Sequence, residues 1–181
     1  MLIVCILGKS GSGKSTLEHR LEEIGYSRIV SYTTRDIREG EENHREYHFV
    51  TEEQFDELIK DNVLIEHAEY NGKRYGAPKP IGSDKYVIVV EPDGLKRFVE
   101  LYGNQVMSIY LDSNSNKIDK NLDKRNDTDE KTRANRVKED EKKFSGIENI
   151  VDYVIDGNCD KDSVFTSAML AINDFESCSL N

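Results

Sequence analysis

The chain has 181 residues, a length that fits one domain with a sizeable core. Its formal net charge of −10 argues against nonspecific binding to nucleic acid and to anionic membranes, because both attract basic surfaces. No apolar run approaches the length of a membrane span, and no basic segment precedes the first strand pattern, so we expect a cytoplasmic protein. The cysteines are widely spaced, which favours neither a disulfide framework nor a zinc site.

The first motif is a glycine-rich stretch between a predicted strand and a predicted helix. The strand is the apolar run at residues 2–7, and the helix has Leu17, Leu21 and Ile24 at helical spacing. Residues 8–15 match the pattern G-x-x-x-x-G-K-[ST]. Glycines in such a loop let backbone N–H groups converge on a polyphosphate at the positive end of a helix dipole. The alternative is a glycine-rich turn with an incidental lysine.

From this motif we expect a site for a polyphosphate. In such a loop Lys14 reaches the β- and γ-phosphates, and the hydroxyl of Ser15 holds Mg²⁺. The residues expected to contact this polyphosphate are Gly8, Ser10, Gly11, Ser12, Gly13, Lys14, Ser15 and Thr16.

The middle of the chain predicts a small β-rich lobe inserted into an α/β core. Residues 28–32 and 45–50 have strand patterns, and the polar loop between them contains two arginines three residues apart, which suits an anion. Thr51 and Gln54 form a capping-box pattern at the start of a helix. Residues 63–70 and 73–76 predict two strands joined by a turn at Asn71-Gly72.

The second half predicts the remainder of a parallel sheet. Strand patterns at 86–90, 106–111 and 151–155 alternate with helix patterns at 95–102 and 164–175, and such crossovers imply an α/β fold. Residues 112–143 are charge-dense with few core formers, so we interpret them as helices that project into solvent and form a mobile lid. A disordered linker is the alternative reading.

Taken together, several of these segments resemble the guanylate kinase family, in order and with similar gaps. The segments are the glycine-rich loop, residues 31–35, Arg38, residues 46–50, residues 65–66 and residues 74–76. That family transfers the γ-phosphoryl group of ATP to GMP or dGMP. The resemblance implies a P-loop NTPase-type parallel sheet flanked by helices, in a single domain at 1–181. Its core would comprise 1–30, 79–112 and 144–181, its lobe for the nucleoside monophosphate (NMP) 31–78, and its helical lid 113–143.

The resemblance also assigns the acceptor site. Arginine forks and tyrosine hydroxyls suit the phosphate of GMP, because bidentate, charge-assisted hydrogen bonds are strong. Glu66 is assigned to the guanine, whose N1–H and N2–H₂ groups a carboxylate accepts side by side. The residues expected to bind GMP are Ser31, Arg35, Arg38, Tyr47, Glu66, Tyr75 and Asp93. Taken singly, each arginine is more typical of a solvated surface, and a strand glutamate is usually solvent-facing.

In the lid, Arg125 and Arg136 match by spacing two arginines that the family brings onto the phosphates. With Lys14, Arg35 and Mg²⁺ they form the expected catalytic set, since phosphoryl transfer needs positioning and charge neutralisation more than a base. A charged helix with incidental arginines is the alternative.

The sequence departs from the family at two informative places. Ala77 stands where the family usually has serine or threonine, whose hydroxyl helps hold the guanine, so the strictness of guanine selection stays open. Residues 91–94 replace a longer acidic segment, which leaves Glu91 and Asp93 both open as ligands of the metal or of the base.

The expected function is therefore ATP- and Mg²⁺-dependent phosphorylation of GMP or dGMP by a monomer or homodimer with small-molecule partners, not nucleic acid or membranes. Two alternatives stay open. One is a related P-loop kinase acting on another nucleoside monophosphate or a phosphorylated sugar, and the other is a noncatalytic guanylate-kinase-like module that binds phosphorylated proteins.

Overall fold

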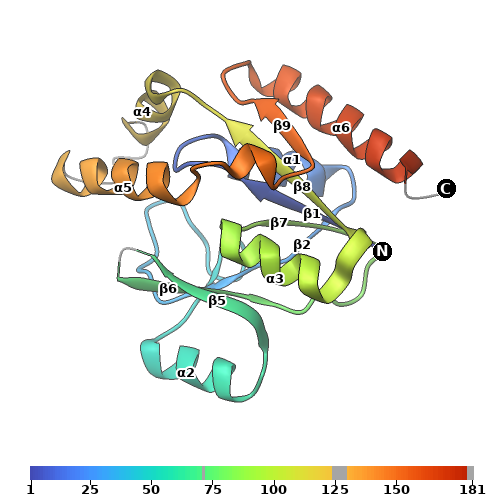
Figure 1. The fold of residues 1–181 in the computed structure, drawn as a ribbon. Helices are drawn as coiled ribbons and strands as arrows, with labels where there is room; N and C mark the ends of the chain where they lie inside the picture. Colours follow the sequence, from blue (N-terminus) through green and yellow to red (C-terminus); the bar gives the residue numbers. More distant parts are fainter. Residues whose placement is uncertain (71, 124–129, 179–181) are drawn as a thin grey trace.

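The computed structural model describes residues 1–70, 72–123 and 130–178. Its core is a five-stranded sheet in the order β2-β7-β1-β8-β9, and every neighbouring pair of strands is parallel. Figure 1 shows this sheet at the centre of the upper part of the molecule. The strands are β1 (Leu2–Leu7), β2 (Ser27–Arg28), β7 (Lys85–Val89), β8 (Val106–Asp112) and β9 (Tyr153–Asp156).

The central strand β1 is buried on both faces, because all of its six residues are apolar. Ile3, Cys5 and Leu7 belong to one core cluster, and the alternate residues of the strand belong to the other. Such a continuous apolar run is typical of a parallel strand covered by helices on both sides.

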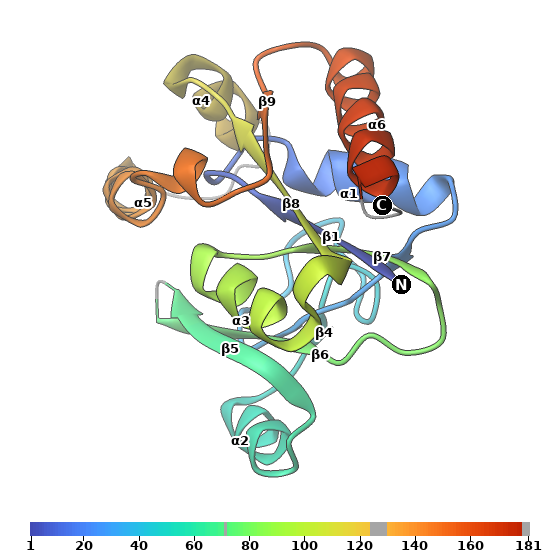
Figure 2. The same cartoon turned by 45° about the vertical axis from the view of Figure 1, so that its right-hand side comes forward.

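Helices cover the two faces unequally. On one face, α1 (Lys14–Glu23) and α6 (Lys161–Cys178) lie together, with Leu21 and Ile172 in the same cluster. On the opposite face, α3 (Pro92–Tyr102) packs through Leu95 and Phe98. Figure 2 shows α1 and α6 separated from α3 by the sheet. Short 3₁₀ turns, η1 (Gly103–Gln105) and η2 (Ile147–Asn149), complete this layer.

A second sheet of four strands forms the inserted lobe, in the order β4-β3-β6-β5. Its strands are β3 (Tyr32–Thr33), β4 (His48–Phe49), β5 (Leu64–Tyr70) and β6 (Lys73–Pro78). The pair β5–β6 is antiparallel, as the hairpin pattern predicts, although Asn71 of the predicted turn lies outside the described residues. The pair β3–β6 is antiparallel as well.

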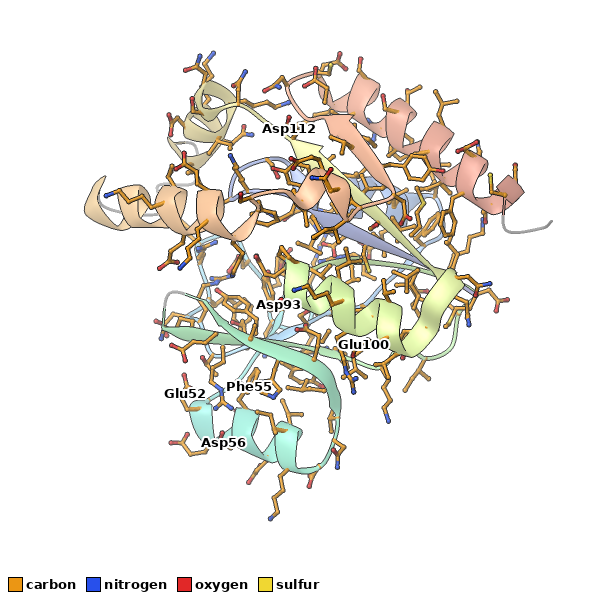
Figure 3. All side chains as sticks on the ribbon, in the orientation of Figure 1. Glu52, Phe55, Asp56, Asp93, Glu100 and Asp112 are labelled. Atoms are coloured by element: carbon orange, nitrogen blue, oxygen red, sulfur yellow. The ribbon has the colours of Figure 1, made fainter. Side chains whose placement is uncertain are left out.

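The helix of the lobe, α2 (Glu52–Lys60), confirms the predicted capping box. The Gln54 N–H donates to the Thr51 hydroxyl at 3.2 Å, and the Thr51 N–H donates to the Gln54 side chain at 2.9 Å. Phe55 of this helix is fully buried, and the guanidinium of Arg74 lies 4.4 Å from the centroid of its ring. Arg74 also pairs with Glu52 and Asp56, which Figure 3 labels along α2.

Two strand predictions are wrong in extent. The predicted strand 28–32 is two short strands in different sheets, because the chain crosses from the core sheet to the lobe at residues 29–31. The predicted strand 45–50 is reduced to His48–Phe49. Before it the chain turns: the N–H groups of Arg45 and Glu46 both donate to the carbonyl of Glu42, which prevents an extended ladder.

The segment interpreted as a lid forms α4 (Ser115–Asp123) and α5 (Glu130–Lys143). Ile118 and Leu122 of α4 are 6% and 4% exposed, so that helix packs against the protein instead of projecting into solvent. Among the described residues, no helix has both the length and the apolar character needed to cross a membrane.

Candidate functional site

The glycine-rich loop lies between β1 and α1, where the central strand ends at the carboxyl edge of the sheet. Gly11 and Gly13 have φ values of +81° and +101°, in the left-handed region that favours glycine. A Cβ atom at Gly8 would lie 2.5 Å from the Ser12 hydroxyl oxygen, so the loop is closed too tightly there for a side chain. Helix α1 begins directly after Gly13, and its N-terminus faces the loop.

The ammonium group of Lys14 lies across this loop. It donates to the carbonyl oxygen of Gly8 at 2.6 Å and to that of Lys9 at 3.0 Å. Ser15, the next residue, is exposed in the first turn of α1. The loop therefore presents a cation and a hydroxyl at one helix N-terminus, which suits a polyphosphate with its metal ion.

Ser12 adds an independent sign of a polar ligand. The side chain is 2% exposed, and its hydroxyl oxygen has no hydrogen-bond partner within the described part of the chain. A buried hydroxyl without a partner is costly, and such exceptions mark a strained site or one that a ligand completes.

In the lobe, Arg35 is held in place by a carboxylate. Its two terminal nitrogens each donate to Glu41 at 2.9 Å, and the guanidinium lies 5.5 Å and 5.4 Å from the ring centroids of Tyr47 and Phe49. The Arg35 side chain is only 10% exposed. The N–H of Arg38 donates to Glu41 as well, so one carboxylate organises the whole arginine loop.

The two predicted tyrosines stand beside these arginines. The rings of Tyr47 and Tyr75 meet edge to face, with centroids 5.9 Å apart. Burial and, to a smaller extent, the neighbouring Tyr75 raise the pKa of Tyr47 to about 12 against the opposing effect of Arg35. The Tyr47 phenol therefore stays protonated at neutral pH and can donate to an anion. The structure thus brings together Arg35, Tyr47 and Tyr75, as the sequence predicts.

Glu66 extends from β5 toward the start of α3. Its carboxylate carbon would lie 3.4 Å from a Cβ atom at Gly94, and its carboxylate accepts from the backbone of Ala77. Burial raises the pKa of Glu66 to about 7, the Ala77 hydrogen bond lowers it, and the charge of Glu91 raises it. Ala77 itself is fully buried. Glu66 is therefore a partly desolvated acceptor at the junction of lobe and core.

The structure separates the two acidic residues left open by the sequence. The Asp93 carboxylate is 83% exposed and accepts from Lys96 at 2.8 Å in the first turn of α3, where Figure 3 labels it. Glu91, the N-cap residue of α3, acts on Glu66 electrostatically and lies 3.3 Å from the Lys143 ammonium. Glu91 is thus the acidic residue nearer to the predicted base site.

For the remaining predicted site residues the structure gives only a backbone position, or they lie outside the described residues. Ser31 is half-buried at the start of the lobe, where its carbonyl accepts from the N–H of His48. Arg125 lies outside the described residues, and Arg136 is described only as a position in α5. Within the described chain, no group of three or more His, Cys, Asp or Glu side chains could hold a metal ion.

Sequence reasoning missed three residues that organise the site: Glu41, Asn121 and Asp140. The Asn121 amide donates to the carbonyl of Gly11 at 2.7 Å, and Asp140 accepts from the N–H of Ser10 at 2.7 Å. The spacing of Glu41 from two arginines in a tight loop is a signal that could have found it. Nothing local distinguishes Asp140 from the other carboxylates of its helix.

Comparisons with known proteins point to one family. A family model described as "Guanylate kinase" matches residues 1–168. The guanylate kinase of Lactobacillus johnsonii is 30% identical over 163 residues, covering 85% of this chain and 79% of that protein. The guanylate kinase of Lactobacillus delbrueckii subsp. bulgaricus is 42% identical over 99 residues, which covers 52% of this chain and 47% of that protein.

A solved structure gives the same result for the fold. The crystal structure of guanylate kinase from Anaplasma phagocytophilum superposes with a TM-score of 0.75 at 27% identity, over 96% of this chain and 85% of that one. The similarity therefore spans nearly the whole chain, the lobe included.

Proposed function

The chain belongs to the guanylate kinase family of nucleoside-monophosphate kinases, and on this premise we propose that it transfers the γ-phosphoryl group of ATP to GMP or dGMP. The observation that carries the choice of acceptor is Glu66. Its partly desolvated carboxylate stands in the same lobe as Arg35, Tyr47 and Tyr75, so a base reader and a phosphate site occur together.

On the donor side, the loop residues Gly8 and Ser10 to Thr16 would hold the polyphosphate of ATP. Lys14 would exchange its carbonyl partners for phosphate oxygens, because a charge-assisted hydrogen bond to an anion is stronger than one to a neutral carbonyl. The exposed hydroxyl of Ser15 beside Lys14 fits Mg²⁺, a hard cation that prefers oxygen ligands. When bound, that ion would neutralise charge on the β- and γ-phosphates.

On the acceptor side, Arg35 and Arg38 would grip the phosphate of GMP. Glu41 holds the Arg35 guanidinium beside Tyr47 before any ligand arrives, so little side-chain freedom is left to lose on binding. The hydroxyls of Tyr47 and Tyr75 would donate to the remaining phosphate oxygens, with Ser31 at the entrance to the lobe.

Glu66 would read the guanine. Its ionised carboxylate accepts two parallel hydrogen bonds from N1–H and N2–H₂, whereas adenine presents a lone pair at the same place. Of the two acidic residues in the segment 91–94, Glu91 is the better placed to assist, although Asp93 keeps its predicted role until tested.

Transfer would then proceed in line between the two phosphates. Lys14 and Arg35, with Arg125 and Arg136 supplied by the lid, would stabilise charge on the equatorial oxygens, and no general base is required. Closure of the lobe (31–78) and the lid (113–143) over the core would exclude water, which otherwise would hydrolyse ATP. We place this reaction in the cytoplasm, with small molecules as the partners.

A coupled assay of ADP release over a panel of ribo- and deoxynucleoside monophosphates tests the proposal. We expect turnover with GMP and dGMP and little with AMP, CMP or UMP. Turnover with a different acceptor alone would favour the related-kinase alternative, for which Ala77 is the specific observation. No ADP release with any acceptor, together with binding of a phosphopeptide, would favour the noncatalytic module.

A further inference from the structure

The phosphate loop is held from outside by both helices of the lid segment. The carbonyl of Gly11 accepts from the Asn121 amide of α4, and the N–H of Ser10 donates to the Asp140 carboxylate of α5, each at 2.7 Å. Ser10 and Gly11 are adjacent, so two residues of the loop are clamped between helices that lie more than 100 residues away in sequence. Figure 2 shows α4 and α5 on the same side of the molecule as the connection between β1 and α1.

Packing supports the α4 contact. A Cβ atom at Gly11 would lie 3.0 Å from the carbonyl oxygen of Ile118 and 3.3 Å from Cγ of Leu122. Gly11 therefore serves two purposes, since its φ of +81° is left-handed and its missing side chain lets the backbone of α4 approach the loop. The position of α4 is fixed against the loop itself.

Burial supports the α5 contact. Asp140 is 4% exposed, whereas Val137, Lys138, Glu139, Glu141 and Lys142 around it are exposed. A carboxylate at the one buried position of this stretch is costly unless it is hydrogen-bonded. Its bond to the Ser10 N–H, a charge-assisted contact, accounts for a carboxylate at that place.

The charge of Asp140 makes a direct role in phosphate binding unreasonable, because a carboxylate repels the donor's phosphates. Its bond also occupies the Ser10 N–H, just as the carbonyl of Lys9 occupies the Ser12 N–H at 3.1 Å. What Asp140 can supply is the orientation of the peptide at Ser10, and through it the path of the loop.

From these contacts we infer that Asn121 and Asp140 are positioning residues that couple the geometry of the phosphate loop to the placement of the two lid helices. The inference rests on the proposed function, because the donor nucleotide is what makes that coupling useful. A loop shaped by its polyphosphate would fix α4 and α5; Arg136 is a position in α5, and Arg125 lies between the two helices in sequence.

The test compares Asp140→Ala, Asp140→Asn and Asn121→Ala with Glu139→Ala, an exposed neighbour on α5 that serves as the matched control. We expect kcat/KM for ATP to fall about 10- to 100-fold in Asp140→Ala, by analogy with other misplaced loops, while the Kd of GMP stays unchanged. Asp140→Asn keeps an acceptor oxygen and should recover most of the loss. The double variant with Asn121→Ala should be less than additive, because both residues hold one peptide segment.

Two readouts that do not need catalysis separate this inference from the proposed function. In NMR spectra the Ser10 amide proton should move upfield in Asp140→Ala more than any other loop amide. Titration with ADP should slow hydrogen exchange at residues 137–143 in the natural chain and much less in the variant. If the natural chain fails to phosphorylate GMP, the proposed function fails while these two measurements still decide the coupling.

The inference is overturned if Asp140→Ala binds ADP and protects α5 as Glu139→Ala does, or if the Ser10 amide does not respond. Should Asp140→Ala not fold, Asn121→Ala carries the test, and Asp140→Asn serves as the conservative variant. An unchanged kcat/KM for ATP in Asn121→Ala would then reject the coupling.

Discussion

The phosphate loop and the acceptor lobe, which the proposed function makes two anion sites, are built in opposite ways. The loop uses backbone groups and a helix N-terminus, at the end of a strand that is buried on both faces. The lobe uses side chains, Arg35, Tyr47 and Glu66, carried by short strands and loops of a small sheet. A site made of backbone groups is specified by the local spacing of glycines, whereas a site made of side chains depends on how distant segments of the chain meet. On the proposed function, we therefore expect the first to accept polyphosphates in general and the second to select the base.

The largest effect should come from breaking the donor site. Lys14→Ala removes the cation that lies across the loop, and kcat should fall by about 10²- to 10³-fold while the fold is retained. Steady-state kinetics with circular dichroism as a check on folding would measure this. Lys9→Ala, in the same loop, is the control and should turn over normally. Near-normal turnover of Lys14→Ala would remove the loop from the mechanism.

The second largest effect should be confined to the acceptor site. Glu66→Gln replaces one acceptor oxygen by a donor that faces guanine N–H groups, so the Kd of GMP should rise by about 10- to 100-fold with the Kd of ATP nearly unchanged. Calorimetric titration of each nucleotide would measure both constants. Glu69→Gln, an exposed glutamate on the same strand β5, should change neither. Equal weakening of GMP and ATP would reject base reading by Glu66.

The pH dependence should also belong to the acceptor site alone. Burial raises the pKa of Glu66 to about 7, and only the ionised form accepts both guanine hydrogen bonds, so GMP affinity should fall about tenfold from pH 8 to pH 6. ADP affinity measured over the same range serves as the comparison. Glu66→Gln is the control, because titration of the GMP phosphate affects this variant and the natural chain alike. In this variant the dependence of GMP affinity on pH should be weaker. A GMP affinity that does not change with pH would contradict the assignment.

A change in folding stability cannot explain the loss of GMP affinity at low pH, because protonation of Glu66 has the opposite effect on stability. Between the ordinary value of 4.5 and about 7, the unfolded chain has released the proton that the folded Glu66 retains. Stability due to this group therefore falls as pH rises through that window, and acidification favours the folded state.

The smallest predicted effect is on stability, and it should be larger in the lobe than in the core. Thr51→Ala removes the hydroxyl that caps α2, and should lower the free energy of unfolding by about 1 kcal/mol. Hydrogen exchange should quicken in α2 while β1 stays protected, and Thr51→Ser should restore the capped value. Equal acceleration in both regions would show that lobe and core unfold as one unit.

The two regions also differ in how far the sequence predicts them. The core strands at 2–7 and 106–111, and the helices that cover them, follow from apolar runs long enough to decide local structure. In the lobe, alternation predicts β5 and β6, but the junction at residues 29–31 joins two sheets without any break in the apolar pattern. Tertiary contacts decide which sheet a strand joins, and the periodicity of apolar residues does not predict this.

The same limit applies within the site. Lys14 is predicted by its glycine-rich context, and Arg35 and Tyr47 by a family pattern, and the structure brings these last two within contact. Asp140 is not predictable, because its role depends on a loop 130 residues earlier in the chain and its neighbours in α5 are equally charged. Glu41 falls between these cases, since its partners are near in sequence but its bidentate geometry exists only in the folded loop.

The distribution of the three thiols offers a way to test whether α4 moves as the proposed lid requires. Cys5 is fully buried in the central strand, and burial raises its pKa, so alkylating reagents should not reach it in the native protein. Cys159 and Cys178 are exposed at the two ends of α6, an 18-residue helix that separates them by about 27 Å. The carbonyl of Cys159 also accepts from Lys117 of α4 at 2.6 Å. A fluorophore on Cys159 would report on the position of α4, and a second fluorophore on Cys178 would serve as the fixed reference. Both labels would use cysteines that the chain already contains.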